Sequence, residues 1–479
     1  MMTTAVLTRT RVWQGTRTHK AVYVLSLLGG LGLWGVMTFC PALWYDESFT
    51  VAVVTQPWEG LWRTATADFH PPLYYCMLKA FCSLLGYNLP VMRAFSLLPA
   101  LCLGAFGWTH IRRTFGERAG ALFSLLVLFC PAAPFFVNEI RMYAWALLFT
   151  TLAAFYAWQW RTHEQPRYAI LFVLFAILGA YTHYYALLTG IAMNLMLLYH
   201  GVRRHKDWKS ILLPAVVQVL GYLPGFLLLA RKVKNVASGY WIPNAPFLYL
   251  SALAFIAASI LLAFLVRRGT RFAAASPAAA GTITLTLGLA LGFSIFVRPI
   301  FVPRYLIPLL GILLFQVTGA LFIQNWKHLS HVLLTIFILC LVCQAGNLVR
   351  SYAPQNNVLA KLSAQFGPQD TIVLGDCQIA GPVAAKESVS PVYWVNNKDP
   401  LNFLAFQGRA IFAASTRDVP LRPGSRMLVV DTQSTDLRAD MLARGFREIT
   451  PPQQIRPLYT FWITLRVSVF EKAAPASMQ

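Results

Sequence analysis

Two adjacent carboxylates, Asp46 and Glu47, stand just beyond the first long apolar stretch of the chain. An ionisable group at the edge of a membrane span is costly to accommodate, so its presence there indicates a functional site. Alternatively, both carboxylates only begin the next helix, because acidic side chains stabilise a helix N-terminus through capping and the helix dipole. Taken alone, this segment is compatible with both interpretations.

Further polar side chains recur beside tyrosines at the ends of later apolar stretches. They are His70, Glu139, Arg141, Tyr143, Tyr181, His183, Arg304 and Tyr305. If the spans bring them to one face of the membrane, they form a polar cleft at its surface. A carboxylate can act as a base, whereas arginine and histidine can bind a phosphate. A sugar carried on a lipid phosphate would use both groups, because its transfer needs an activated acceptor hydroxyl and a stabilised leaving phosphate.

The composition of this 479-residue chain is that of a polytopic membrane protein. Hydrophobic residues make up 57% of it and charged residues 12%, the mean hydropathy is +0.55, and apolar runs long enough to cross a bilayer recur. In a soluble chain, the net charge of +22 would suggest a nucleic-acid partner. Here the basic residues cluster beside apolar spans, so we interpret them as determinants of topology and expect no nucleic acid to bind.

The distribution of basic residues predicts about 11 transmembrane helices. Residues 1–20 carry basic side chains and no acid, so we expect them to be cytoplasmic and the first span to be a retained helix. Segment 42–88, rich in proline and tryptophan, is then a long external loop with one or two helices along the interface. The predicted spans are 21–41, 89–110, 119–136, 143–160, 168–181, 185–200, 211–230, 247–266, 272–297, 303–323 and 331–349.

One basic cluster, Arg231, Lys232 and Lys234, falls on the external side and breaks this pattern. The positive-inside rule is a statistical bias that tolerates such a cluster. The other interpretation is that the cluster attracts an anionic headgroup. The sequence favours neither.

The C-terminal segment 351–479 has lower hydropathy and short runs typical of strands. Strands are predicted at 371–374, 392–395, 410–413, 427–430 and 461–470, with an amphipathic helix at 436–445. No catalytic spacing occurs there, and Asp376, Asp431 and Asp436 are interpreted as strand-end and capping residues. We therefore predict an all-α polytopic membrane domain, 21–350, followed by a small α/β extracytoplasmic domain.

The order of the polar motifs resembles a family of integral-membrane glycosyltransferases that use lipid-linked sugars. This is the GT-C superfamily, family 39, which includes protein O-mannosyltransferases and lipid A aminoarabinose transferases, and the resemblance is to its bacterial branch. The motifs are WYDE at 44–47, HPPLYY at 70–75, EIRMYA at 139–144, YTHY at 181–184 and RYL at 304–306. Together they cover the first ten spans, whereas the C-terminal segment resembles no family that we name.

The resemblance implies a GT-C architecture and an inverting transfer. The donor would be a polyprenyl-phosphate sugar, and the acceptor a protein, a lipid or a polysaccharide. The enzyme would be a multi-pass protein of the bacterial plasma (inner) membrane, in contact with membrane lipids, with its site on the extracytoplasmic side. Asp46 would be the catalytic base, and Glu47 would support or position it.

The resemblance also implies roles for the remaining motif residues. His70, Arg304 and Tyr305 would contact the donor phosphate, although His70 stands where the aminoarabinose branch carries a lysine. The residues expected to bind substrate are Glu139, Arg141, Tyr143, Tyr181 and His183. Structural roles are the alternatives: a cap before Pro71 for His70, a snorkelling side chain for Arg304, and a hydrogen-bonded core histidine for His183.

Two other classes of protein remain open on the sequence alone. A lipid or solute transporter or flippase would also have many spans, but with repeat-related broken helices and charges near mid-span. A receptor or scaffold would need no carboxylate cluster. The metal content is undetermined, because Asp46, Glu47, His70 and Glu139 could bind a divalent cation but lack a diagnostic spacing, and no other cofactor is expected.

Overall fold

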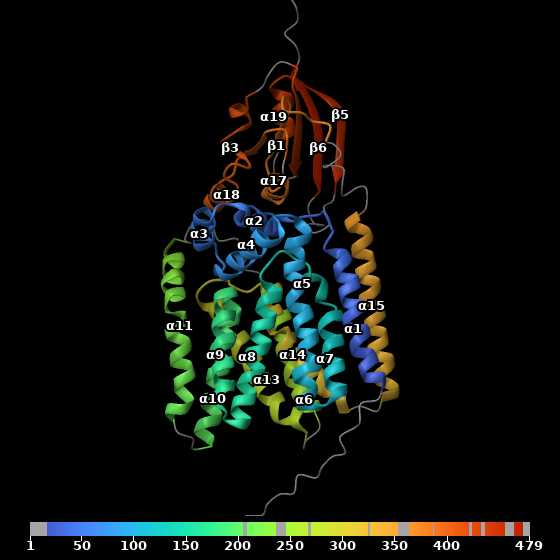
Figure 1. The fold of residues 1–479 in the computed structure, drawn as a ribbon. Coiled ribbons are helices and arrows are strands. Elements are labelled where there is room, and N and C mark those ends of the chain that lie inside the picture. Colours follow the sequence, from blue (N-terminus) through green and yellow to red (C-terminus); the bar gives the residue numbers. More distant parts are fainter. Residues whose placement is uncertain are drawn as a thin grey trace, which may run out of the picture.

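The computed structural model consists of a long helical bundle with a sheet domain at one end (Figure 1). Helices of an intermediate layer separate the two. The structure describes residues 17–204, 208–235, 246–266, 270–323, 326–352, 364–386, 388–420, 424–432, 436–455 and 464–472.

The bundle contains one long helix for each span that the sequence predicts. These are α1 (Arg17–Met37), α5 (Leu89–Phe106), α7 (Glu117–Phe129), α8 (Tyr143–His163), α9 (Pro166–Thr182), α10 (Tyr184–Arg203), α11 (Trp208–Asn235), α12 (Tyr249–Leu265), α13 (Arg271–Phe296), α14 (Ile307–Ile323) and α15 (Trp326–Tyr352). Among the described residues, seven helices are long and apolar enough to cross a membrane by length and composition alone. This confirms the polytopic all-helical membrane domain.

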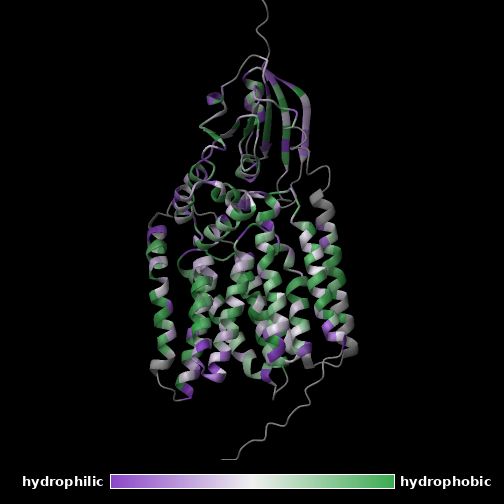
Figure 2. Cartoon of the chain, viewed as in Figure 1, coloured by the Kyte–Doolittle hydropathy of each residue, from purple (hydrophilic) through white to green (hydrophobic). Residues whose placement is uncertain are grey.

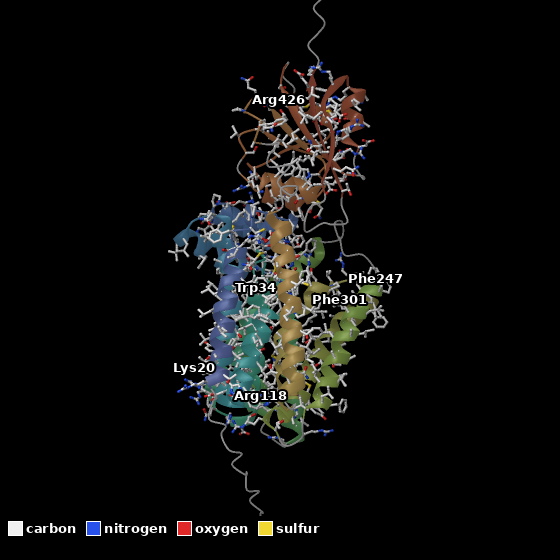
Figure 3. All side chains as sticks on the ribbon, turned by 90° about the vertical axis from the view of Figure 1, so that its right-hand side faces the viewer. Lys20, Trp34, Arg118, Phe247, Phe301 and Arg426 are labelled. Atoms are coloured by element: carbon white, nitrogen blue, oxygen red, sulfur yellow. The ribbon has the colours of Figure 1, made fainter. Side chains whose placement is uncertain are left out.

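Short helical turns extend or connect these helices. A π-helical turn, η1 (Gly107–Ile111), continues α5 into α6 (Arg112–Phe115), and the 3-10 turns in the bundle are η2 (Ala133–Phe135), η4 (Pro246–Leu248) and η5 (Pro303–Leu306). The middle of the bundle is apolar, and hydrophilic residues gather at its two ends (Figure 2). Lys20 and Arg118 lie at the end opposite the sheet domain (Figure 3).

Three short helices lie between the bundle and the sheet domain: α2 (Tyr45–Thr55), α3 (Trp58–Ala67) and α4 (Leu73–Leu85). Pro57 directly precedes α3 and Pro72 directly precedes α4, as expected for a residue that cannot donate a backbone hydrogen bond. The sequence predicted one or two helices along the interface here and, as the alternative interpretation of the two carboxylates, a helix that begins at Asp46 and Glu47; the structure contains three helices. Because α2 begins at Tyr45, Asp46 and Glu47 occupy its first turn, where the helix dipole favours a carboxylate.

The C-terminal domain is a six-stranded sheet of order β3-β2-β1-β4-β6-β5 with short helices. Its elements are β1 (Thr371–Leu374), α17 (Cys377–Ala384), β2 (Val392–Val395), α18 (Pro400–Ala405), β3 (Ile411–Ala413), η7 (Thr416–Asp418), β4 (Arg426–Thr432), α19 (Leu437–Ala443), β5 (Phe446–Ile455) and β6 (Leu465–Lys472). Strands β1 to β4 pair in parallel, and β6 runs antiparallel to both β4 and β5. The predicted small α/β domain is therefore confirmed.

The sequence missed strand β5, and its prolines explain why. Pro451 and Pro452 interrupt the strand pattern, and the register with β6 shifts on either side of Thr450. Proline is tolerated because β5 lies at the edge of the sheet. The predicted strand 461–470 corresponds to β6, and residues 461–463 lie outside the described residues.

Acidic residues of the sheet domain cap its elements, as the sequence predicted. Asp376 accepts a hydrogen bond from the Gln378 amide at the start of α17 (2.8 Å). Asp436 accepts one from Ala439 at the start of α19 (3.2 Å). Asp431 accepts the amide of its neighbour at the end of β4 (2.8 Å). These carboxylates therefore have local structural roles.

The sheet domain rests directly on α2. The Tyr45 hydroxyl donates to Asn402 of α18 (2.7 Å), and the Gln56 side chain donates to the carbonyl oxygens of Leu404 and Ala405 in the same helix. A Cβ atom at Gly381 of α17 would lie 2.6 Å from the Ser48 hydroxyl, so the two helices approach too closely for a side chain there. The helix that carries both carboxylates is thus packed from both sides.

Candidate active site

Asp46 forms an ion pair with Arg304, 258 residues further along the chain. The Asp46 Oδ2 atom lies 2.7 Å from Arg304 Nη1, and the two side chains are 17% and 22% exposed. Arg304 comes from η5 at the start of α14, and its guanidinium lies over the Trp44 ring, 5.1 Å from the centroid. The structure therefore joins two of the predicted site residues in a partly open ion pair.

Glu47 forms a second ion pair, which is fully buried. Its Oε1 atom lies 2.7 Å from Arg93 Nη1 and also accepts the Ile140 amide (3.0 Å). Arg93 bonds the second carboxylate oxygen at 3.2 Å and the carbonyls of Ala42 and Asn138. Glu47 thus ties the start of α2 to α5 and to the segment before α8, which suits a positioning role.

The sequence analysis missed Arg93, the partner of Glu47. It lies in the first turns of α5, within a stretch that is otherwise apolar. An arginine within an apolar span indicates a paired or functional charge, so the sequence alone could have pointed to Arg93.

Arg141 contacts α2 through two hydrogen bonds. Its Nη1 atom donates to the Thr50 hydroxyl (3.1 Å) and to the Asp46 carbonyl (3.2 Å), and the side chain is buried. It forms no ion pair with Glu139 among the described residues; instead its backbone amide donates to the Glu139 carbonyl (2.7 Å). Arg141 therefore brings a buried positive charge close to Asp46.

His70 is paired with Asp68, a residue that the sequence analysis did not single out. His70 Nδ1 lies 3.3 Å from Asp68 Oδ2, and the Tyr75 hydroxyl donates to the same oxygen (2.7 Å). Arg141 Nη2 lies 3.4 Å from the same ring nitrogen, so Nδ1 contacts both a carboxylate and a guanidinium. Burial opposes ionisation of Asp68, but His70 and Arg141 outweigh it and lower its pKa, while burial lowers the pKa of His70. Burial thus favours the neutral form of the His70 imidazole, which contacts the Asp68 carboxylate.

Lys232 connects the unusual basic cluster to this site. Its ammonium donates to the His70 carbonyl oxygen (2.8 Å), and the side chain is only 7% exposed. The sequence analysis recognised the cluster but had no means of assigning its contact. Three cationic side chains, Arg141, Lys232 and Arg304, now converge on α2 and the segment before α4 from three separate elements. We call Asp46, His70, Arg141, His183, Lys232 and Arg304 the Asp46 cluster.

An aromatic wall with two unsatisfied polar atoms borders this cluster. His183 Nδ1 accepts the Tyr185 amide (3.1 Å), and the His183 ring lies 5.1 Å from the Tyr305 ring and 5.6 Å from the Tyr143 ring. His183 Nε2 and the Tyr143 hydroxyl are both buried without a hydrogen-bond partner among the described residues. Such atoms are rare in native structures and mark positions where a ligand can supply the missing partner.

Glu139 is half-buried beside the same charges. Burial, with the negative charge of Glu47 nearby, raises the pKa of Glu139 to about 8. At neutral pH its carboxyl group is therefore mainly protonated and can donate a hydrogen bond.

Tyr181 is the one predicted site residue that turns away from the Asp46 cluster. Its hydroxyl donates to the Gly221 carbonyl of α11 (3.1 Å), and its ring packs against Tyr222, 4.8 Å between centroids. These contacts join α9 to α11. Its expected contact with substrate is untested.

No group of three or more His, Cys, Asp or Glu side chains in the described parts of the chain could hold a metal ion. Asp46, Glu47 and His70 each have a different partner within the protein. The proposals below therefore assign no role to a divalent cation.

The fold and these contacts define a class: a multi-pass membrane protein with a carboxylate and several cations gathered at one end of its bundle, beneath an α/β domain. Residues 69–227 match the family model for dolichyl-phosphate-mannose-protein mannosyltransferase. That match covers the segment from just before His70 to the middle of α11. No curated protein sequence matches the chain.

Two solved structures of ArnT from Cupriavidus metallidurans share this fold. The apo structure is 13% identical, with a TM-score of 0.61, over 95% of this chain and 99% of the other. The structure bound to undecaprenyl phosphate is 14% identical, with a TM-score of 0.56, over 95% and 98%. The likeness includes nearly the whole of both chains. Together with the family match over residues 69–227, it agrees with the resemblance read from the motifs: this chain has the fold of the ArnT structures.

Proposed function

We propose that this protein transfers a sugar from a polyprenyl-phosphate donor to an acceptor at the extracytoplasmic face of the membrane. The observation that carries the proposal is the partly open Asp46–Arg304 pair, which sets a carboxylate next to a guanidinium at the end of the bundle. The family match and the solved ArnT complex with undecaprenyl phosphate support a lipid-linked donor. The acceptor would be a protein, a lipid or a polysaccharide.

The proposed chemistry is an inverting displacement. An acceptor hydroxyl oxygen attacks the anomeric carbon from the side opposite the phosphate, and a new glycosidic bond forms. The bond between that carbon and the phosphate oxygen breaks, and its electron pair leaves with the polyprenyl phosphate. Asp46 takes the hydroxyl proton, because it is the partly exposed carboxylate of the cluster.

Arg304 would change partners when the donor binds. In the structure its guanidinium neutralises the Asp46 carboxylate. A donor phosphate offers the guanidinium a second anionic, bidentate partner, and its negative charge increases when the bond to the sugar breaks. Donor binding would therefore stabilise the leaving group and free the base in one step.

The other cations would complete the phosphate site. Lys232 has three N–H donors, one of which bonds the His70 carbonyl. Arg141 adds a buried charge, and the unsatisfied Nε2 of His183 can donate once Nδ1 accepts the Tyr185 amide. His70 and Tyr305 would contribute to the same site from either side, and Glu139 and Tyr143 would contact the sugar or the acceptor.

The proposed side of the membrane follows from the basic residues. Lys20 and Arg118 lie at the end of the bundle opposite the Asp46 cluster (Figure 3), and cytoplasmic ends of spans are enriched in such residues. We infer an inner-membrane protein whose domains are residues 1–20 inside, 21–350 in the membrane with loop 42–88 outside, and 351–479 outside. Accessibility of tags near Arg113 and after Ser477 from either side of the membrane tests this orientation.

A transfer assay with purified protein tests the function. The protein is incubated with polyprenyl-phosphate sugars carrying a radiolabel and with envelope fractions as acceptor. We expect release of polyprenyl phosphate, label in one acceptor class, and a product whose anomeric configuration, measured by NMR, is opposite to that of the donor. Retention of configuration would overturn the inverting mechanism. A lack of both donor binding and turnover across the panel would overturn the proposed function.

A further inference from the structure

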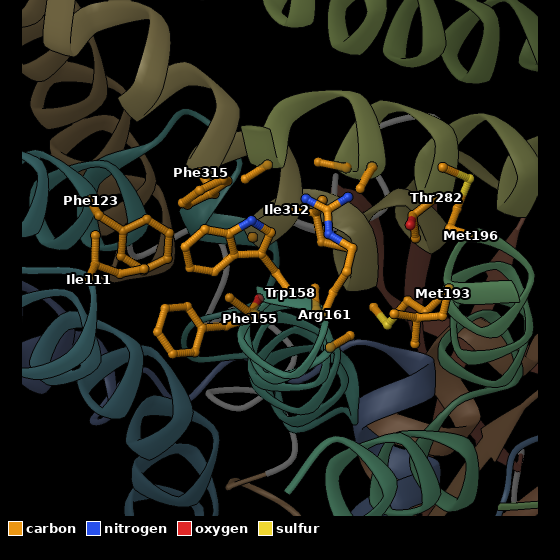
Figure 4. Close-up of a pocket in the computed structure, with 18 of the residues that line it drawn as sticks. Ile111, Phe123, Phe155, Trp158, Arg161, Met193, Met196, Thr282, Ile312 and Phe315 are labelled. Atoms are coloured by element: carbon orange, nitrogen blue, oxygen red, sulfur yellow. The ribbon is translucent and has the colours of Figure 1, made fainter. Parts of the chain in front are cut away.

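A second site is a cavity inside the bundle, and Figure 4 shows the side chains that line it. It is a cavity of about 80 Å³ between α8, α10, α13 and α14. Most of its lining is apolar, including Phe155, Trp158, Met193, Met196, Ile312 and Phe315. An apolar cavity does not hold water well and destabilises the protein when it is empty, so an apolar group that fills it is favoured.

The cavity has a polar rim formed by Arg161 and His200. Both residues line the cavity and lie in the last turns of α8 and α10. Arg161 Nη1 lies 2.9 Å from His200 Nε2, and Nη2 donates to the Ala274 carbonyl (2.6 Å). Within the described ranges no carboxylate pairs with Arg161, so an imidazole and a carbonyl hold a full positive charge.

Arginines outnumber acids near Arg161, whose own helix ends at the exposed Glu164. Arg203 and Arg204 follow His200 at the end of α10, and the only acid between residues 200 and 210 is Asp207. Like charges at this density repel one another unless an anion lies among them. This end of the bundle is also the one that the positive-inside rule assigns to the cytoplasm.

We propose that the Arg161 cavity binds one anionic phospholipid of the cytoplasmic leaflet. The lipid phosphate meets Arg161, whose planar guanidinium can bind two phosphate oxygens at once, and His200 lies beside it. The end of one acyl chain enters the cavity between Trp158 and Met196. This site is independent of the proposed sugar transfer.

A lipid fits the cavity better than a soluble anion does. A soluble phosphate would satisfy the rim but leave the apolar cavity empty. An uncharged lipid would fill the cavity but leave the Arg161 charge without an anionic partner. Only an amphipathic anion matches both observations, and the cytoplasmic leaflet supplies it as phospholipid.

The experiment compares lipid binding to the full-length protein in detergent. Native mass spectrometry and thermal unfolding are measured with phosphatidylglycerol or phosphatidylcholine added. For the wild type we expect one retained phosphatidylglycerol and a larger rise in Tm than with phosphatidylcholine. Arg161→Gln should weaken phosphatidylglycerol binding about tenfold or more. Arg167→Gln is the matched control, because Arg167 lies exposed at the start of α9, against Tyr168, and outside the cavity.

A second variant tests the cavity if Arg161→Gln folds poorly. Ala279→Leu keeps the rim and fills part of the cavity, so it should raise the Tm without lipid and reduce phosphatidylglycerol retention. Equal retention by wild type and both cavity variants would overturn the proposal, as would equal stabilisation by phosphatidylcholine. Complete displacement of phosphatidylglycerol by equimolar polyprenyl phosphate would overturn its assignment to a phospholipid.

Discussion

Asp46 and Glu47 are neighbours in one turn of α2, and each pairs with an arginine at 2.7 Å, but the two ion pairs differ in exposure. The side chains of Asp46 and Arg304 are 17% and 22% exposed, whereas those of Glu47 and Arg93 are 1% and 2% exposed. Consecutive residues of an α-helix point about 100° apart, which follows from 3.6 residues per turn. One carboxylate therefore faces the packed interior and the other faces the partly open cluster.

The difference separates a structural pair from a pair that can react. Both oxygens of Glu47 are hydrogen-bonded, and Arg93 reaches two backbone carbonyls as well, so this pair can exchange its partners only at a high cost. In the proposed mechanism the partly open Asp46–Arg304 pair separates when Arg304 binds the incoming donor phosphate. The buried Glu47–Arg93 pair holds α2 in place. We propose that the Asp46–Arg304 pair at the start of the same helix takes part in the reaction.

The largest expected effect is the loss of sugar transfer in Asp46→Asn. An amide preserves the shape of the side chain but cannot take the acceptor proton, so the turnover number should fall about 100- to 10,000-fold. Transfer of labelled sugar is measured with wild type and variant at matched amounts. Because the helix packing is unchanged, the Tm should stay close to that of the wild type, and it serves as the control for folding.

Wild-type turnover by the Asp46→Asn protein would show that Asp46 is not the base. The His70–Asp68 pair would then be the next group to test, since a neutral imidazole held by a carboxylate can also accept a proton.

For Glu47→Gln we expect the opposite result: a large loss of stability and a small loss of transfer activity. Removing one partner of a buried ion pair leaves the other charge uncompensated, which typically costs about 3–5 kcal/mol. We expect a clearly lower Tm in detergent and, for the protein that remains folded, a turnover number within about tenfold of the wild type. If Glu47→Gln keeps the wild-type Tm but loses transfer, the division of roles between the two carboxylates is wrong.

The family resemblance assigned the base role to Asp46 and a supporting role to Glu47, but the sequence could not show what each carboxylate contacts. A charge at the exit of an apolar span is visible in the sequence because it is costly. Which side of α2 each carboxylate faces depends on how that helix packs against α5 and the sheet domain. Arg93 and Arg304 are 46 and 258 residues away from their partners, and only the packing of the helices brings them close.

The spans were predictable for a simpler reason. Twenty apolar residues with basic residues at one end define a membrane helix locally, without knowledge of its neighbours. Such local reasoning cannot explain the position of Lys232. The topology rule marks its cluster as an exception, but only the fold shows that its ammonium bonds His70.

A smaller effect, confined to donor use, is expected for Arg304→Ala. Loss of the guanidinium removes a phosphate partner, so the apparent KM for the polyprenyl-phosphate sugar should rise more than the KM for the acceptor. Arg304→Lys should recover part of this loss, because the ammonium keeps the charge but not the bidentate geometry. Donor and acceptor titrations separate the two effects. Unchanged donor dependence with full activity would remove Arg304 from the phosphate site.

The smallest expected effect concerns Glu139, which extends the comparison to a third carboxyl group near α2. Unlike Asp46 and Glu47, it has no ion-pair partner among the described side chains, and burial raises its pKa to about 8. In the unfolded chain the same group loses its proton near pH 4.5. Between these two values the folded protein binds one proton more than the unfolded protein does.

The stability of the wild type should therefore fall as the pH rises from about 4.5 to about 8, because excess protons on the folded state give a negative slope of unfolding free energy against pH. Glu139→Gln cannot titrate and lacks this contribution. The two proteins should have similar Tm values at pH 5, and the variant should become progressively more stable relative to the wild type up to pH 9. Parallel curves of Tm against pH would show that Glu139 ionises normally, and the proposed protonated carboxyl group beside the Asp46 cluster would then be wrong.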